Sequence, residues 1–403
     1  MKADPLTRRL GPCPCGSGKR YRDCHGALRP KQDPHGLAEL YEMSARGQRE
    51  EALARIEDKL RATPDAADLF NGRGLLRVEA MDLDGARADF EAAIALAPEF
   101  IGAHSNRAHL LLMRGDYARG WPEYEWRTKD SPANYPFKAP RWRGEPLAGR
   151  RVLVHAEQGH GDCIHFARFL APLAAQGAVF DVFCHPSLVS LLARVAGVRA
   201  TSHHFPDLGE HDFHAPLIDL AIPQLPDASA PHWFGPYISP LPGRVERFAP
   251  MLSGAARPFV GIAWKGNPSH DNDRNRSLTR EVARQLVAPG MTSVNLQLGE
   301  APLHGSMLDA ARDFADFEDT AAVISMLDHV ISVDTAVAHL AGAMGKPVTL
   351  LVAFTPDWRW RDRGETTPWY PSMRLARQAR AGDWSGPLET ALKRATGPAT
   401  ARS

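Results

Sequence analysis

The sequence has almost no net charge, few cysteines and no long hydrophobic run. Its 48 Lys and Arg residues against 47 Asp and Glu residues give a formal charge of +1. This balance removes a global electrostatic reason for binding nucleic acid or a membrane surface. No stretch approaches the roughly 20 apolar residues of a membrane-spanning helix, and residues 1–10 are polar and basic, unlike a signal peptide. We therefore expect a cytoplasmic protein.

Five cysteines in 403 residues are too few for a disulfide framework. Three of them, Cys13, Cys15 and Cys24, lie within twelve positions, and His25 follows directly. Three thiolates and an imidazole are the usual ligands of a tetrahedral zinc ion, and the glycines between them permit the tight reversal that a short loop around the ion needs. We expect a structural zinc site, and the alternative is a reactive tail without metal.

The segment 13–26, with CPCGSGK at its start and CHG at its end, resembles the SEC-C zinc motif of SecA translocation motors at every ligand position. In that family the motif docks onto other proteins, including a chaperone and the ribosome. The resemblance implies that residues 1–32 form a docking module. All four zinc ligands would come from protein, which leaves no open metal position for catalysis.

Residues 33–130 repeat with a period near 34, the spacing of tetratricopeptide (TPR) repeats. Small residues, Ala52 and Ala86, and larger apolar ones, Ile56 and Phe90, keep the same phase across two periods. The pattern predicts an α-solenoid that binds proteins or peptides, and a generic helical bundle is the alternative. A third unit has lost the closing proline and keeps the repeat positions Ala108, Gly120 and Tyr124, together with Trp121 and Trp126.

From residue 150 onward, short apolar segments alternate with amphipathic ones, a pattern typical of parallel sheets covered on both faces. We expect two α/β lobes, residues 140–245 and 256–385, followed by a C-terminal helix or tail at 386–403. Open α/β sheets bind ligands at the carboxyl ends of their strands, so the expected site is a cleft between the lobes. The expected strands are 151–156, 179–184, 259–265, 293–298, 329–333 and 347–352, and the expected helices are 165–175, 280–287, 320–326 and 335–344.

One stretch of the second lobe combines groups that suit a diphosphate. Asp334 and Thr335 end an expected strand, and the next helix carries His339 one turn further on. Backbone amides at a helix start favour anions, and Lys265 at the end of another strand would add positive charge. An Asp-Thr pair before an apolar run is equally typical of a simple helix N-cap, and Lys265 of a solvated lysine. The residues alone leave both interpretations open.

Three motifs resemble the ADP-heptose:lipopolysaccharide heptosyltransferases, the family 9 glycosyltransferases. They are QGHGD at 158–162, AWKGN at 263–267 and DTAVAHLAG at 334–342. The chain resembles still more closely the bacterial TPR proteins that carry such a domain, through PDWRW at 356–360 and PWYP at 368–371. The resemblance spans residues 142–384 and implies the GT-B fold, in which two Rossmann-like lobes face a cleft.

The resemblance also implies roles for individual residues. Asp162 falls on the proposed general base of the family, which takes the proton of the attacking hydroxyl. His160 is a second candidate for this role, and the alternative for Asp162 is a cap on the following helix. Glu300 lies where such folds contact the nucleoside.

The donor-phosphate positions of the family fall on Lys265, Asp334, Thr335 and His339. These groups would stabilise charge on the departing nucleoside diphosphate without a catalytic metal. Heptosyltransferases lack the repeats and the zinc motif, and the loop 267–276 is unusually polar and basic here, with Arg274 and Arg276. Both departures put a heptose donor and a lipid-saccharide acceptor in doubt.

Three functions follow from these motifs. The first is an inverting glycosyltransferase that moves a sugar from a nucleoside-diphosphate sugar to a protein acceptor recognised by the TPR region. The second is the same chemistry with a saccharide or lipid-linked acceptor. The third is a non-catalytic adaptor in which the zinc motif and the repeats bind protein partners. The presence of all the expected donor-site residues favours catalysis.

Overall fold

The computed structural model forms two compact units, Met1–Ala103 and His104–Ser403. The boundary falls within the segment 33–130 that the sequence marks as one repeat region. The four expected zinc ligands, Cys13, Cys15, Cys24 and His25, lie outside the described residues. The structure describes residues 33–130, 137–204, 210–224, 233–268, 270 and 272–397.

The first unit contains helices α2 (Leu37–Ala45), α3 (Arg49–Ala62), α4 (Ala67–Glu79) and α5 (Leu83–Leu96). The repeat positions Ala52, Ile56, Ala86 and Phe90 are all fully buried on α3 and α5, so the positions that keep phase in the sequence are core positions. Gly74 allows close packing, because a Cβ there would lie 2.5 Å from the Phe90 ring. The sequence prediction of paired helices is confirmed for these two repeats.

The third pair of helices lies almost entirely in the second unit. It consists of α6 (Ile101–Arg114) and α7 (Tyr117–Tyr124), followed by the single turn α8 (Arg127–Asp130). The Asp116 carboxylate accepts a hydrogen bond from the Arg119 amide and caps α7. Within the second unit, Trp121 of α7 contacts Phe166 and Trp358, which belong to helical segments beside the first and the second sheet.

The first sheet is parallel, with the order β3-β2-β1-β4. Its strands are β1 (Arg151–His155), β2 (Val179–Phe183), β3 (Val198–Ser202) and β4 (Phe213–Pro216). Helical segments connect them: α9 (His160–Phe166), η2 (Ala167–Phe169), α10 (Leu170–Ala174), η3 (Pro186–Leu188), α11 (Val189–Leu192) and η5 (Leu217–Gln224).

The second sheet is also parallel and has the order β10-β9-β8-β5-β6-β7. Its strands are β5 (Phe259–Ala263), β6 (Thr292–Asn295), β7 (Leu308–Asp309), β8 (His329–Val333), β9 (Val348–Val352) and β10 (Met373–Arg377). The helices are α13 (Asp273–Arg276), α14 (Arg280–Ala283), η7 (Arg284–Leu286), η8 (Ala311–Asp313), α15 (Phe317–Met326), α16 (Ala336–Ala343), η9 (Trp358–Trp360) and α17 (Ser385–Thr396).

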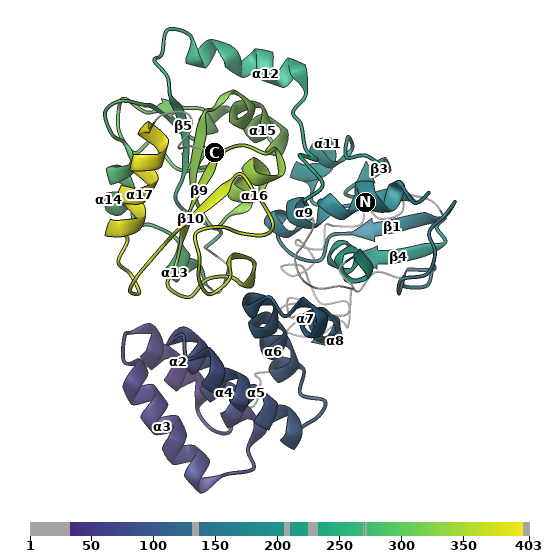
Figure 1. The fold of residues 1–403 in the computed structure, drawn as a ribbon, viewed down its shortest axis with the longest axis vertical. Helices are drawn as coiled ribbons and strands as arrows, with labels where there is room; N and C mark the ends of the chain where they lie inside the picture. The colour runs from purple at the N-terminus through teal and green to yellow at the C-terminus, as the bar shows by residue number, and fades with distance from the viewer. Residues whose placement is uncertain are drawn as a thin grey trace, which may run out of the picture. The chain divides into compact units, whose positions relative to one another are not determined.

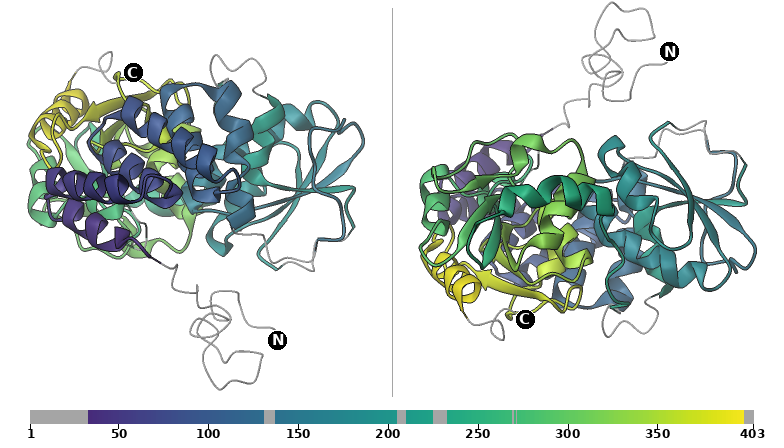
Figure 2. Two further views of the ribbon diagram at one scale, coloured as in Figure 1. Left: turned by 90° about the horizontal axis from the view of Figure 1, so that it is seen from below. Right: turned by 90° about the horizontal axis from the view of Figure 1, so that it is seen from above.

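Both sheets follow the doubly wound Rossmann order. Counted in chain order, the second sheet reads 6-5-4-1-2-3, and the first contains the corresponding strands 3-2-1-4. Figures 1 and 2 show them as separate groups of strands, teal for the first sheet and green to yellow for the second. The expected α/β architecture with parallel sheets is therefore confirmed. No helix among the described residues is long and apolar enough to cross a membrane.

Several element boundaries differ from the sequence predictions. The predicted helix 165–175 starts earlier, at His160, because the Asp162 carboxylate accepts a 3.0 Å hydrogen bond from the Gly159 amide and stabilises the first turn. The predicted strand 293–298 ends at Asn295, where the chain turns outward and leaves Leu298 66% exposed. Strands β3, β4, β7 and β10 were not predicted, because they are short or lack a continuous apolar run.

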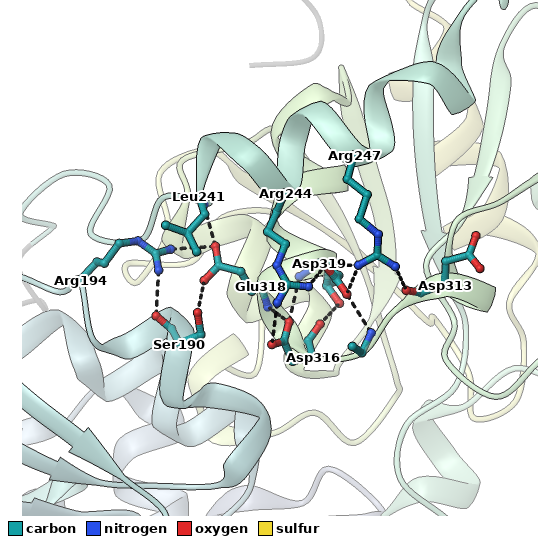
Figure 3. Close-up of polar contacts among 11 residues, drawn as sticks. Ser190, Arg194, Leu241, Arg244, Arg247, Asp313, Asp316, Glu318 and Asp319 are labelled. Carbon is teal, nitrogen blue, oxygen red and sulfur yellow. Dashed lines mark hydrogen bonds and ion pairs between the residues drawn. The ribbon is translucent and has the colours of Figure 1, made fainter.

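A connector links the two sheets through α12 (Pro242–Phe248) and η6 (Ala249–Leu252). Figure 3 shows how it is fixed to the start of α15. The fully buried Glu318 accepts hydrogen bonds from the Leu241 amide at 2.7 Å and from Arg194 on the first-sheet side at 2.8 Å. Arg244 on α12 donates to the equally buried Asp319 at 2.6 Å. These charge-assisted bonds fix the connector against both sheets.

Candidate functional site

The site lies at the topological switch point of the second sheet. In a doubly wound sheet, ligands bind outside the carboxyl ends of the two central strands, from which the chain proceeds in opposite directions. Here these strands are β5 and β8, and Ala263 pairs with Ser332 near their ends. Two residues further along each strand are Lys265 and Asp334. The register therefore places two of the predicted donor-site residues at the same edge of the sheet.

Lys265 and Glu300 are brought together by the loops that follow β5 and β6. Lys265 Nζ lies 2.6 Å from Glu300 Oε1, and Gln297 Oε1 accepts a 2.8 Å hydrogen bond from the Lys265 amide. The two residues that the sequence assigned to phosphate and nucleoside are thus direct neighbours. Glu300 Oε2 also lies 3.9 Å from Arg280 Nη1. Arg280 is at the wall of a solvent-open depression of about 470 Å³, whose lining residues are Arg280, Arg284, Val287, Pro302, Leu303, His304 and Gly305.

Arg276 is a site residue that the sequence did not assign. Its Nη1 donates to the Asp334 carbonyl oxygen at 2.9 Å, and its Nε to Asp273 at 3.2 Å. Gly266 permits this close approach, because a Cβ there would lie 2.5 Å from Arg276 Nη2. The guanidinium group therefore lies at the end of β8, beside the start of α16. The basic character of the loop 267–276 was the only signal for it in the sequence.

Helix α16 begins directly after Asp334 with Thr335 as its N-cap residue. The Thr335 side chain makes no capping hydrogen bond, and its Oγ1 lies 3.2 Å from Ser332 Oγ. The simple side-chain cap that the sequence allowed is therefore not formed. The amides of the first turn point toward the switch point, as an anion site requires.

His339 is buried one turn into α16. Its Nδ1 lies 2.9 Å from the Tyr370 hydroxyl, which is also 3.0 Å from His165 Nδ1. Burial holds the pKa of both imidazoles well below their ordinary value, so both rings are neutral at pH 7. The other nitrogen of His339, Nε2, lies 3.9 Å from Asp334 Oδ1. Burial, reinforced by the charge of Asp357, raises the pKa of Asp334 to about 6.

Asp162 reaches this group from the first sheet. Its helix, α9, packs against α16 (Figure 1), and Gly161 makes the approach possible because a Cβ there would lie 2.9 Å from the His339 ring. Asp162 forms an ion pair with Arg359 of η9, and Arg359 also binds Asp357 at 2.9 Å. Burial raises the pKa of Asp162, and the charge of Arg359 opposes this effect.

His160 occupies a different environment from Asp162, although both lie in the first turn of α9. Its ring stacks on His185 with centroids 4.4 Å apart and on Phe317 at 5.3 Å. Burial and the neighbouring His185 lower the pKa of His160 to about 4. This neutral imidazole packs between elements of the two sheets, whereas Asp162 faces the charged groups of the site.

The third helix pair contributes to the same region. The Tyr124 hydroxyl accepts a 3.2 Å hydrogen bond from Gln158 in the loop before α9. Trp121 contacts both Phe166 on α9 and Trp358 on η9, with ring centroids 6.1 and 5.5 Å apart. Sequence reasoning placed these aromatic residues in a repeat, and their position beside Asp162 follows only from the three-dimensional fold.

Comparisons with known proteins agree with these features. Residues 12–27 match the SEC-C motif, and residues 315–381 match glycosyltransferase family 9 (heptosyltransferase). The chain thus combines a segment similar to the SEC-C motif with a segment similar to family 9 glycosyltransferases. The SEC-C match includes all four predicted zinc ligands, and the family 9 segment includes Asp334, Thr335, His339, Arg359 and Tyr370.

One curated relative covers most of the chain. Protein FlbA from Caulobacter vibrioides is 27% identical over 392 residues, which cover 85% of this chain and 64% of FlbA. The chain thus spans less than two thirds of the length of this relative.

Two kinds of solved structure are also similar. A family 9 glycosyl transferase from Veillonella parvula matches 62% of this chain and 97% of its own, with 10% identity and a TM-score of 0.47. The TPR domain of P58(IPK) matches 24% of this chain and 27% of its own, with 24% identity and a TM-score of 0.23.

Proposed function

We propose that this protein is a glycosyltransferase that moves a sugar from a nucleoside-diphosphate sugar to an acceptor hydroxyl. One observation carries the proposal: α9 of the first sheet meets α16 of the second, so that Asp162 lies among the groups at the β5–β8 switch point. A carboxylate on one side and an anion-binding helix start on the other are the two parts that this reaction needs.

In the proposed reaction, the acceptor oxygen attacks the anomeric carbon as its proton passes to Asp162. The bond between the anomeric carbon and the phosphate oxygen breaks, and the electron pair leaves with the nucleoside diphosphate. The new glycosidic bond has the opposite anomeric configuration, because the attack comes from the face opposite the leaving group. Arg276, Lys265 and the first-turn amides of α16 balance the negative charge of the diphosphate, so we assign no role to a catalytic metal.

The donor extends along the ends of the strands of the second sheet. Its diphosphate lies at Thr335 and Asp334, with the His339 Nε2 beside it, and its nucleoside extends toward Glu300. The ion pair between Lys265 and Glu300 is partly exposed, with 42% of the lysine side chain accessible. Because such exposed pairs contribute little to stability, a diphosphate can displace Glu300 from Lys265.

We further propose a protein acceptor, in keeping with the paired helices of the first unit, which are typical of peptide-binding arrays. The segment with Cys13, Cys15, Cys24 and His25 would hold structural zinc and provide a docking site for a chaperone or the ribosome. Elemental analysis tests the zinc assignment: we expect one zinc ion per chain, lost in a Cys13→Ser/Cys15→Ser variant. A zinc-free wild-type protein would contradict this assignment.

A thermal-shift panel of nucleoside diphosphates and their sugars tests the transferase proposal. A ligand at about 100 times its Kd stabilises the folded protein by about 2.7 kcal/mol. We expect one nucleotide to raise the Tm of the wild type, and Lys265→Ala and His339→Ala to abolish the effect. Lys393→Ala on α17 is the matched control, because Lys393 is exposed. If no donor raises the Tm, the non-catalytic adaptor becomes the better account.

A further inference from the structure

Arg359 is a buried cation between two carboxylates that come from the two sheets. Asp162 is presented by α9 of the first sheet, and Asp357 follows β9 of the second. Arg359 forms ion pairs with both, and only 5% of the residue is exposed. Arg359 therefore links Asp162 on α9 to the segment that follows β9.

The position of Arg359 is fixed by its surroundings. Its backbone amide donates to Asp357 Oδ1 at 2.9 Å, and its carbonyl oxygen accepts from Thr367 Oγ1 at 3.2 Å. The guanidinium carbon lies over the Trp358 ring, 4.2 Å from the centroid. A planar guanidinium held by stacking and hydrogen bonds loses little further entropy when it pairs with a carboxylate. This pair is therefore unlike a mobile ion pair at the surface.

The contacts of Asp162 leave it able to accept a proton. Oδ2 accepts from the Gly159 amide at 3.0 Å, and Oδ1 faces Arg359. Because each carboxylate oxygen has two lone pairs, each keeps one for another donor. Arg359 thus orients Asp162 without using all of its acceptor capacity.

Charges of both signs surround Asp162, and Arg359 is the charged group that lowers its pKa most. Burial and the charge of Asp357 raise the pKa of Asp162, whereas Arg359 and, to a smaller extent, His270 lower it. The Tyr124 hydroxyl on α7 also faces Asp162, and burial raises the pKa of this phenol, so it is neutral at pH 7. Arg359 is the main group that favours the ionised carboxylate.

We propose that Arg359 is the positioning residue that keeps Asp162 ionised and oriented toward the acceptor hydroxyl. This inference rests on the proposed transferase function. With Arg359 in place, the carboxylate is charged before the acceptor arrives and can take its proton during the attack. Without Arg359, burial and Asp357 both favour the protonated acid, which cannot accept a further proton.

The pH dependence of turnover tests this role, because a merely structural contact would not move it. The assay follows release of the nucleoside diphosphate from the nucleotide sugar selected by the binding panel, from about pH 5 to 9. In Arg359→Gln we expect the acidic limb of kcat/KM to move up by about one to two pH units. Arg359→Lys keeps the charge and should leave the limb near its wild-type position.

Two further variants separate the effect of Arg359 from other causes. Asp357→Asn removes a negative charge beside Asp162 and should move the acidic limb to lower pH, the opposite direction. This variant also decides the question if Arg359→Gln does not fold. Arg199→Gln is the control. Arg199 lies on the edge strand β3 and pairs with Asp181 on β2, so this variant also breaks an arginine–aspartate pair.

Burial raises the pKa of Asp334 to about 6, within the pH range of this assay, and the charges of Asp357 and Arg359 also act on it. Repeating the profiles in an Asp334→Asn background assigns the shift, and a shift that persists there supports Asp162 as its source. An active enzyme whose acidic limb is unmoved in Arg359→Gln, or whose shift disappears in the Asp334→Asn background, overturns the inference and leaves the transferase proposal intact. A wild-type protein that neither binds nor turns over any nucleotide sugar overturns both.

Discussion

The first two helix pairs and the third share one repeat spacing but have different surroundings. Helices α2 to α5 bury aliphatic residues among themselves, with Leu40, Ile56 and Leu76 in their core. Helices α6 and α7 instead direct aromatic residues at the α/β elements, where Trp121 meets Phe166 and Trp358. A repeat pattern therefore predicts how two helices pair, but not what the outer face of the pair contacts.

The ion pairs of the two regions differ in the same way. Arg55 on α3 pairs with Glu39 and Glu51 at the surface, and 47% of its side chain is exposed. Arg127 on α8 pairs with Glu157 and with the buried Asp219 of η5, which follows β4, and 10% of its side chain is exposed. The first region is held by its own core, whereas the last helices complete the second unit.

Shortening the chain should produce the largest contrast between these regions. A chain of residues 101–403 keeps α6 and α7 whole, and we expect it to fold cooperatively, because no core residue of the α/β unit is removed. A chain of residues 131–403 loses Trp121, Tyr124 and Arg127, which exposes the rings of Trp358 and Phe166 and leaves Asp219 with fewer partners. We expect it to aggregate or melt at a much lower temperature.

Circular dichroism and calorimetric melting of the two shortened chains measure this contrast. The full-length protein provides the control for expression and for the melting of the first unit. If residues 131–403 fold as stably as residues 101–403, the third helix pair is not an integral part of the second unit.

Single arginine substitutions should give a smaller contrast of the same kind. Arg127→Met leaves the buried Asp219 carboxylate with Arg141 as its remaining partner, and we expect it to lower the free energy of unfolding by about 3 kcal/mol. Arg55→Met removes only surface ion pairs and should change it by less than about 0.5 kcal/mol. Urea denaturation measures both, and equal effects would contradict the distinction between the two regions.

Much of this architecture could be predicted from the sequence, because it depends on local patterns. Continuous apolar runs predicted β8 to the residue and β1, β2, β5 and β9 to within two residues. The expected phosphate residues Lys265 and Asp334 do lie together, because the ends of parallel strands share one edge of the sheet. The zinc site stays a prediction.

Other parts of the site depend on contacts between distant segments. Arg359 lies 197 residues from Asp162 in the sequence, and the PDWRW motif at 356–360 that contains it does not indicate this pairing. The Tyr370 hydroxyl joins His165 on α9 to His339 on α16. Such pairings follow from the packing of α9 against α16, and a single sequence contains no record of that packing.

We propose that the third helix pair and the two sheets together form one complete donor-binding unit. Isothermal titration of the 101–403 chain with the nucleoside diphosphate selected by the binding panel tests this proposal. We predict the same Kd as for the full-length protein, because Lys265, Arg276 and α16 all lie within residues 104–403. Loss of binding in a shortened chain that still melts cooperatively would contradict the claim, because the donor site would then require the first unit.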